Sequence, residues 1–459
     1  MPRVSHAAGL LLILVRTNSF SPSSSGEWFF GCRHGHEKTL QNELILGDDR
    51  VRASHLETLA PGLVRWRAPA LESVTGDAAC EVLRRYDLTW ATQVLPACRR
   101  ARADSIGALA SGCIAAAGLA VVEEGDDDDA GSARARLLAA PRGSLRVHAL
   151  VPDTFKGANR PALQARCEAI AEKVTKQLRA QYRAARPARS ATDATGDDDD
   201  ATAPRWLLQL LLVGRAEVAV SLARCAPDLG VGSWPNWRAP AGLCAADVDG
   251  YMPSSAYRKL AEALDLMGLG ADGGAGASAP LVADGGAPFY CVDLGASPGG
   301  WTALLRRRGC RVVAVDRSPL DGALFVGGAP ANAADFARRG GACGFERTPA
   351  DGAASMVAFV AGDAFAWTPP DGPADLMVCD VASYPKRVAE LLERWCGARW
   401  AARVIVTCKF QGDEPDWGAL EDARAVARKH GYEHRSKHFF NNKNECTLML
   451  RLADESGGG

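Results

Sequence analysis

One stretch of the chain, residues 289–316, limits the possible folds more than any other. Its sequence, FYCVDLGASPGGWTALLRRRGCRVVAVD, is apolar, then glycine-rich, then apolar again, and it stops on an acid. This pattern predicts a strand ending at Asp293, a turn, a helix from about Trp301 and a second strand over 311–315. The turn contains Gly295, Gly299 and Gly300. These elements in this order make half of a βαβ unit and indicate a parallel α/β sheet.

The acid at the end of the second strand, Asp316, indicates the class of ligand. A carboxylate at this place can accept hydrogen bonds from two ribose hydroxyls, so the ligand should contain a nucleoside. NAD and S-adenosylmethionine both contain one. The glycines of GASPGG lack the G-x-G-x-x-G spacing that brings a helix N-terminus onto a pyrophosphate, and S-adenosylmethionine has no pyrophosphate. A tight turn in a parallel sheet, with no ligand, is the alternative.

The length and charge of the chain set further limits. At 459 residues it is too long for one ordinary core, so we expect two or three globular domains. The net charge is -1, but two acidic runs, EEGDDDDAG and TDATGDDDDAT, hold eleven acids, and the remainder without them is +10. We interpret the runs as solvated insertions. A basic remainder suits a polyanionic partner, although dispersed surface charge also explains it.

The cysteines and the N-terminus bear on the compartment. The fourteen cysteines include no C-x-x-C pair, and Cys291, Cys379 and Cys408 lie inside apolar strands, where a thiol acts as a small core residue. We therefore expect a reducing compartment and no metal. Residues 1–26 contain no acid, two arginines and many serines, which is typical of a transit peptide or a disordered extension. The predicted location is cytoplasmic or organellar, neither secreted nor membrane-bound.

Two units are expected before the α/β domain. Residues 27–100 indicate a small α+β unit with a turn at Gly35. Residues 101–240 contain a strand at 145–151, an amphipathic helix and two apolar strands, with an acidic insertion. Alternating strands and helices over 245–455 predict a doubly wound α/β domain.

Charged residues stand at the strand ends of this last domain. Asp363 follows FVAG, Asp380 ends LMVCD and Lys409 ends VIVTCK, whereas Glu445 begins ECTLML. In an open α/β sheet, ligands bind beyond the carboxyl ends of the strands. We therefore expect the first three side chains, together with Asp316, to converge on one cleft.

Lys409 is the candidate general base. A lysine directly after an apolar strand should be partly desolvated, and desolvation next to another cation lowers a lysine's pKa. A neutral amine there could accept a proton. A lysine that only reaches solvent from the strand end is the alternative.

The motifs resemble those of a known family. DLGASPGGWT, with AYRKL before it and VCD, CKF and NEC after it, resembles the FtsJ-type ribose 2′-O-methyltransferases. The start CRHGHEKTLQNEL and the order of the units resemble the M-type bacterial members, which modify a cytidine ribose of large-subunit ribosomal RNA. This resemblance implies a Rossmann-like class I methyltransferase domain over 245–455, preceded by a ferredoxin-like domain over 27–100 and a THUMP-like RNA-binding domain over 101–240.

The resemblance also implies roles for individual residues. The family's catalytic tetrad falls on Lys259, Asp380, Lys409 and Glu445. Lys409 would take the proton from a ribose 2′-hydroxyl, Lys259 would keep Lys409 poised, and the two acids would orient the amines. The residues implied to hold S-adenosylmethionine are Asp293, Gly295, Ser297, Pro298, Gly299, Gly300, Trp301, Asp316, Asp363 and Asp380. Within this set, Asp316 would bind the ribose, Asp363 the adenine amine, and the glycine turn with Trp301 the methionine part.

Two other functions stay open on the sequence alone. One is an NAD(P)-dependent Rossmann enzyme, against which the glycine spacing speaks. The other is a noncatalytic RNA-binding or ribosome-assembly factor on the same fold. A complete tetrad speaks against the latter, because a chain freed from catalysis has no physical reason to keep two lysines and two acids at these positions.

Overall fold

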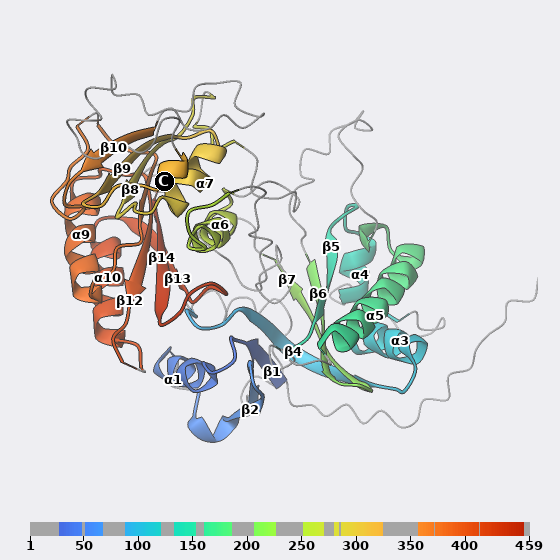
Figure 1. Cartoon of the computed structure of the whole chain (residues 1–459). Helices are drawn as coiled ribbons and strands as arrows, with labels where there is room; N and C mark the ends of the chain where they lie inside the picture. The colour runs from blue at the N-terminus through green and yellow to red at the C-terminus, as the bar shows by residue number, and fades with distance from the viewer. Residues whose placement is uncertain are drawn as a thin grey trace, which may run out of the picture.

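The computed structural model describes residues 27–47, 51–67, 88–120, 133–152, 160–185, 206–225, 251–269, 280–283, 286–324, 357–370, 372–412 and 414–453. The N-terminal 26 residues and both acidic runs lie outside them. The described parts form two seven-stranded sheets with helices packed against them (Figure 1).

The first sheet contains strands from both N-terminal units. In chain order they are β1 (Glu27–Gly31), β2 (Leu56–Ala60), β3 (Leu63–Arg67), β4 (Gln93–Arg102), β5 (Leu145–Leu150), β6 (Trp206–Gly214) and β7 (Glu217–Arg224). The accompanying helices are α1 (Glu37–Gly47), α3 (Ile106–Ala116), α4 (Ala133–Leu138) and α5 (Arg160–Gln181), with 3-10 turns η1 (Ala53–His55) and η3 (Arg183–Ala185). In space the strand order is β2-β3-β1-β4-β7-β6-β5.

Strand β4 joins the two predicted units into one sheet. Its first half pairs with β1 and its second half, from Arg99, pairs with β7, both antiparallel. The predicted boundary at residue 100 therefore lies inside a continuous strand. The assignment of these units as ferredoxin-like and THUMP-like stays a prediction.

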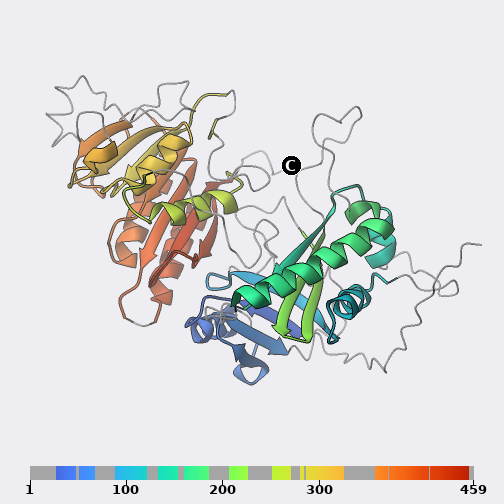
Figure 2. The ribbon, with the colours of Figure 1, turned by 45° about the vertical axis from the view of Figure 1, so that its right-hand side comes forward.

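The apolar sequence of β6, WLLQLLLVG, follows from its central place in this sheet. Figure 2 shows α5 lying across β5, β6 and β7. On that side Leu208 and Leu210 share a buried cluster with Ile170 and Val174 of α5. On the other side Leu211 belongs to a different buried cluster. A strand covered on both faces needs apolar residues at successive positions rather than at alternate ones.

The second sheet forms the predicted α/β domain. Its strands are β8 (Tyr290–Leu294), β9 (Arg311–Asp316), β10 (Val357–Ala361), β11 (Leu376–Cys379), β12 (Arg403–Lys409), β13 (Tyr432–Lys437) and β14 (Glu445–Leu452). The helices are α6 (Tyr257–Leu266), α7 (Gly300–Arg307), α9 (Pro385–Gly397) and α10 (Trp417–Lys429), with a 3-10 turn η7 (Gly322–Leu324). The predicted strand, glycine turn, helix and strand over 289–316 are confirmed to within one residue at the ends.

The strand order β10-β9-β8-β11-β12-β14-β13 is that of a doubly wound sheet in which β14 runs antiparallel to its neighbours. Alternate residues of β11 face opposite layers. Leu376 and Val378 pack in the cluster that contains α6 and α7, whereas Met377 and Cys379 pack in the cluster that contains α9 and α10. The Rossmann-like fold class predicted for this domain is confirmed.

The N-terminal part of the first sheet packs directly against the second domain (Figure 1). The ring of Trp90 lies 6.3 Å from that of Phe410 and 6.5 Å from that of Trp417. Trp28 and Phe30 of β1 belong to the same buried cluster. A shared apolar core of this kind attaches the two parts more firmly than a flexible linker does.

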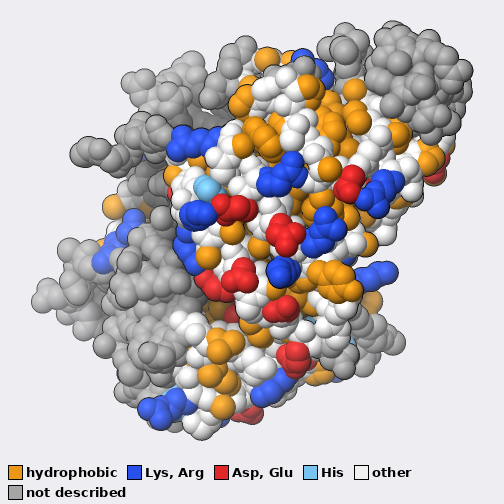
Figure 3. Space-filling view, turned by 90° about the vertical axis from the view of Figure 1, so that its left-hand side faces the viewer, with side chains coloured by type: hydrophobic (Ala, Val, Ile, Leu, Met, Phe, Trp, Pro, Cys, Tyr) orange, Lys and Arg blue, Asp and Glu red, His pale blue; other side chains and the backbone are white. Residues whose placement is uncertain are grey.

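The outer face over α9 and α10 carries charges of both signs. Figure 3 shows its basic and acidic side chains interspersed. Ion pairs join Lys429 to Glu393 and Arg428 to Glu421. A face with such a mixture has no strong field of one sign, so it is poorly suited to bind a polyanion.

Candidate active site

The predicted functional residues gather along one edge of the second sheet. Strands β8 to β12 are parallel, so their carboxyl ends share this edge. Strand β14 runs antiparallel to β12, and the register places Glu445, at its start, opposite Lys409, at the end of β12. The direction of the sheet order also reverses between β8 and β11, which is where doubly wound folds bind their ligands.

The glycine turn after β8 is closely packed. Gly295 has a φ of +76°, and a Cβ there would lie 2.2 Å from Cγ2 of Val381. Gly299 has a φ of +112°, and a Cβ there would lie 2.6 Å from Cδ1 of Leu324. Both positions thus require glycine for backbone conformation and for space. The turn lies against Val381, the residue after Asp380, so the glycine turn and the candidate catalytic strand end adjoin one another.

The rest of the turn is fixed by hydrogen bonds. Ser297 donates its Oγ hydrogen to the carbonyl of Pro319 at 2.9 Å, and the carbonyl of Pro298 accepts from the amide of Asp321 at 2.8 Å. Gly300 begins α7. Trp301 is buried and donates from Nε1 to the carbonyl of Ala256 at 2.7 Å, which anchors α7 to the segment before α6.

Asp316 has the geometry expected for a ribose acceptor. Its Oδ2 accepts from the amide of Ser297 at 3.0 Å and its Oδ1 accepts from the amide of Ser318 at 2.8 Å. A carboxylate has about four acceptor sites, so each oxygen keeps one for a hydroxyl. The half-exposed side chain therefore fits the nucleoside part of S-adenosylmethionine.

Asp363 lies beyond the end of the neighbouring strand β10. Its Oδ1 accepts from the amide of Phe365 at 2.9 Å, and its Oδ2 pairs with Arg317. The backbone hydrogen bond and then Arg317 hold the pKa of Asp363 below its usual range. Asp363 is thus a carboxylate at neutral pH, able to accept a hydrogen bond from an amine.

Asp293 is placed differently from the other acids. It is 1% exposed and accepts from Thr302 Oγ1 at 2.6 Å, beneath the glycine turn. Burial, opposed by the Thr302 hydrogen bond and reinforced by the Asp380 and Asp316 carboxylates, raises the pKa of Asp293 to about 7. Its contact with α7 gives it a role in holding the turn. The prediction that it binds the cofactor stays a prediction.

This shift should appear in the stability of the protein. Between the ordinary aspartate pKa and about 7, folded Asp293 keeps a proton that the unfolded chain has released, so its contribution to stability falls as pH rises. From pH 5 to pH 6, wild type should therefore lose about 1 kcal/mol of stability relative to Asp293→Asn, and the loss per pH unit should become smaller as the pH approaches 7. Urea unfolding at several pH values measures this. The stability of Asp422→Asn, changed at an exposed site, should vary with pH in parallel with that of wild type. If the stability of Asp293→Asn also varies in parallel with that of wild type, the raised pKa of Asp293 is contradicted.

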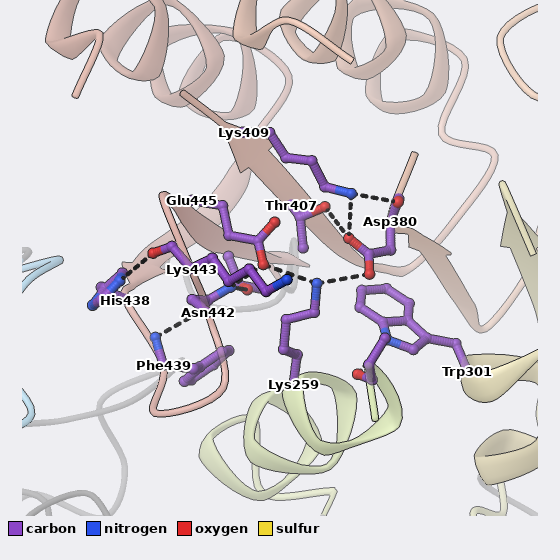
Figure 4. Close-up of polar contacts among 12 residues, drawn as sticks. Lys259, Trp301, Asp380, Thr407, Lys409, His438, Phe439, Asn442, Lys443 and Glu445 are labelled. Carbon is purple, nitrogen blue, oxygen red and sulfur yellow. Dashed lines mark hydrogen bonds and ion pairs between the residues drawn. The ribbon is translucent and has the colours of Figure 1, made fainter. Parts of the chain in front are cut away.

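The four tetrad residues form one connected network (Figure 4). Lys259 Nζ lies 2.7 Å from Oδ2 of Asp380 and 2.9 Å from Oε1 of Glu445. Lys409 Nζ lies 3.1 Å from Oδ1 of Asp380 and donates to the Asp380 backbone carbonyl at 2.9 Å. Asp380 therefore contacts both lysines, and of the four side chains predicted to converge, Asp380 and Lys409 lie in direct contact.

The two lysines differ in environment. The side chain of Lys259 is 8% exposed, whereas that of Lys409 is 28% exposed. Burial alone would lower the pKa of Lys259, but Asp380 and Glu445 more than offset burial and the pKa is raised. Lys259 therefore stays charged at neutral pH, and Lys409 is the amine that a second substrate can reach.

Two contacts to the network are absent from the sequence predictions. Thr407 donates its hydroxyl to Asp380 Oδ1 at 2.7 Å, and Asn442 Nδ2 donates to Glu445 Oε1 at 3.3 Å. The position of Thr407 had a signal in the sequence, because residues two apart on a strand share a face and Thr407 precedes Lys409 by two. Asn442 lies in a loop, where no periodicity marks it.

Other classes of site have little support in the described residues. There, no cluster of three or more histidine, cysteine or acidic side chains is placed to hold a metal ion. The eleven cysteines in those parts are buried and form no disulfide bonds with one another. None of the described helices combines the length and hydropathy that a membrane span requires.

Comparison with known proteins agrees with this geometry. Residues 252–394 match the family model described as FtsJ-like methyltransferase. The "Ribosomal RNA large subunit methyltransferase M" of Laribacter hongkongensis is 30% identical over 257 residues, 54% of this chain and 60% of that protein. The protein of the same name from Aromatoleum aromaticum is 32% identical over 171 residues, 36% of this chain and 39% of that protein.

The chain thus spans less than two thirds of the length of either curated relative. The region of similarity contains the glycine turn, Lys259, Asp316 and Asp380. Residues 252–394 thus resemble the FtsJ-like methyltransferase family in sequence, and the glycine motif and the geometry of the strand edge agree with that match.

Proposed function

We propose that the chain transfers a methyl group from S-adenosylmethionine to a ribose 2′-hydroxyl of RNA, and that this RNA is large-subunit ribosomal RNA. The observation that carries the proposal is the network of two lysines and two acids beside the glycine turn and Asp316. The printed names of the curated relatives support ribosomal RNA as the substrate.

Lys409 is the base in this proposal. A neutral amine has two N–H donors and one lone pair. Asp380 offers two acceptors to Lys409 Nζ, its backbone carbonyl at 2.9 Å and its Oδ1 at 3.1 Å. When both N–H groups are used in this way, the lone pair is left to accept the proton of the 2′-hydroxyl. Thr407 fixes the carboxylate by its hydrogen bond to the same Oδ1.

Lys259 has a supporting role. It is held by two carboxylates and remains charged, so it is a poor proton acceptor. Proton transfer is therefore left to Lys409, the more exposed of the two amines.

The bound cofactor supplies a methyl group on a positively charged sulfur, and the sulfide that leaves is neutral. The protein therefore need not stabilise a leaving anion. Its contribution is to align the hydroxyl oxygen with the methyl carbon and to remove the proton. Asp316 and Asp363 would hold the nucleoside end, and the glycine turn would lie along the methionine part.

Methyl transfer to RNA tests the proposal. The full chain is incubated with S-adenosylmethionine labelled in the methyl group and with ribosomal RNA from cells that lack the protein. A 2′-O-methyl group blocks alkaline cleavage of the adjacent phosphodiester, so the label should appear in alkali-resistant dinucleotides. Label in mononucleotides indicates methylation of a base and contradicts the ribose assignment. Absence of label in RNA contradicts the substrate.

The cofactor assignment predicts a large effect at Asp316. Asp316→Ala removes two charge-assisted hydrogen bonds to the ribose and should weaken S-adenosylmethionine binding by about 2 kcal/mol or more. Calorimetry measures it. Asp321→Ala is a matched control, because the carboxylate of this nearby half-buried acid accepts from the Tyr251 hydroxyl and from the amide of Ala323. Equal affinity of Asp316→Ala and wild type, or tight binding of NAD by wild type, contradicts the assignment.

A further inference from the structure

We propose that Asn442 is a positioning residue for the tetrad, and that the N-terminal part of the chain holds it in place through Arg33. The inference rests on the proposed function and extends it, because it gives residues 27–47 and 88–102 a part in catalysis besides any part in binding RNA. It starts from the loop that joins β13 to β14, residues 438–444, which ends at Glu445 (Figure 4).

Asn442 connects this loop to the tetrad. The side chain is 1% exposed. Its Nδ2 donates to Oε1 of Glu445 at 3.3 Å, the same oxygen that accepts from Lys259 at 2.9 Å. Its Oδ1 accepts from the amide of Phe439 at 2.6 Å, which fixes the rotation of the side-chain amide. Asn442 therefore limits where the Glu445 carboxylate can lie, and Glu445 in turn limits Lys259.

The N-terminal part of the chain holds the loop from one side. A guanidinium nitrogen of Arg33 donates to the backbone carbonyl of Asn442. The amide of His438 donates to the carbonyl of Thr89 at 2.7 Å, and the ring of His438 lies 4.3 Å from that of Trp90. The anchor extends into β13, where Lys437 Nζ donates to carbonyls on either side of Thr89 and Trp90.

Helix α6 holds the loop from the other side. Glu262, three residues after Lys259, is buried and accepts from the amide of Phe440 at 3.1 Å and from the side chain of Asn441. The helix that carries Lys259 is therefore bonded to the same loop that carries Asn442. The loop is fixed between Arg33 and α6, so the spacing of Lys259 and Glu445 depends on both.

The expected effect is on the chemical step. Asn442 does not contact the strand ends that hold Asp316 and Asp363, so cofactor affinity should not change when it is replaced. Asn442→Ala removes the amide donor from Glu445 and should lower kcat about tenfold or more, with little change in KM for RNA or in the affinity for S-adenosylmethionine. Arg33→Met should act in the same direction, and Arg33→Lys, which keeps a donor for the carbonyl, should recover part of the loss.

A double-mutant cycle separates positioning from a merely structural role. If Asn442 acts through Glu445, then Asn442→Ala combined with Glu445→Gln should be no slower than Glu445→Gln alone. Asn444→Ala is the matched control, because this asparagine of the same loop donates to the carbonyls of Phe410 and Gly412 instead. Its kcat should stay within about twofold of wild type.

Each outcome decides between the two proposals. If wild type methylates RNA and the effects of Asn442→Ala and Glu445→Gln multiply, the inference is wrong and the proposed function stands. The same holds if Asn442→Ala raises KM for RNA and leaves kcat unchanged. If Asn442→Ala does not fold, the cycle is run with Arg33→Met, at a half-buried site. If wild type transfers no methyl group to RNA, the proposed function and the inference fail together.

Discussion

Lys409→Ala should lower the rate of methyl transfer by about 10² to 10⁴, the usual contribution of a general base, with S-adenosylmethionine affinity nearly unchanged. The reason is geometric. Lys409 is the more exposed amine of the network, and Asp380 offers it two acceptors, so in the proposed mechanism a neutral Lys409 turns its lone pair toward the substrate. Single-turnover methylation of RNA measures the rate, and calorimetry measures the affinity.

Lys409→Arg distinguishes a base from a positive charge. A guanidinium keeps its charge at any workable pH, so this variant should be as slow as the alanine variant. Lys429→Ala, which removes an exposed lysine paired with Glu393, should leave the rate unchanged. Near-normal turnover by Lys409→Arg means that Lys409 acts only as a cation. The proton must then leave by another route, and Asp380 is the next candidate.

Lys259→Met should destabilise the folded chain by about 3 to 5 kcal/mol, the usual cost of removing one partner from a buried ion pair. The substitution leaves Asp380 and Glu445 close together without the cation that both contact. The free energy of unfolding in urea measures the loss. Methyl transfer should also fall, because the two carboxylates then repel each other and Asp380 no longer holds Lys409 in place.

The comparison with an exposed pair makes this prediction specific. Lys429→Met breaks the ion pair with Glu393. The side chains of Lys429 and Glu393 are 62% and 44% exposed, so this substitution should lower the free energy of unfolding by less than about 1 kcal/mol. The double variant Lys259→Met, Glu445→Gln should recover part of the lost stability, because only one of the two mutually repelling carboxylates then remains. A loss at Lys259 as small as that at Lys429 contradicts a buried network.

Much of the second domain followed from local patterns in the sequence. Apolar runs that end on an acid or a lysine predicted the strands and the side chains at their carboxyl ends, as with Asp316, Asp380 and Lys409. The glycines after β8 predicted the turn, because two of them adopt positive φ. These features are local, since strand propensity and glycine conformation depend on residues near one another in the chain.

Other features depended on contacts that no local pattern contains. Strand β4 extends across the boundary predicted at residue 100, because its two halves pair with strands that lie far apart in sequence. Asp293 also ends an apolar strand, and no local pattern showed that its carboxyl is buried and accepts from Thr302. Whether a strand-end acid faces the ligand or the core depends on the helix packed over it.

The sequence by itself determined the fold class of the second domain and the place of its glycine turn, and its resemblance to a known family marked the four charged residues. The tertiary structure decided how those residues are connected: Asp380 contacts both lysines, Lys259 is buried and stays charged, and Lys409 remains accessible. It also brought Arg33 to Asn442, 409 positions along the chain. Burial and distant hydrogen bonds set these properties, and both exist only once the two sheets have packed together.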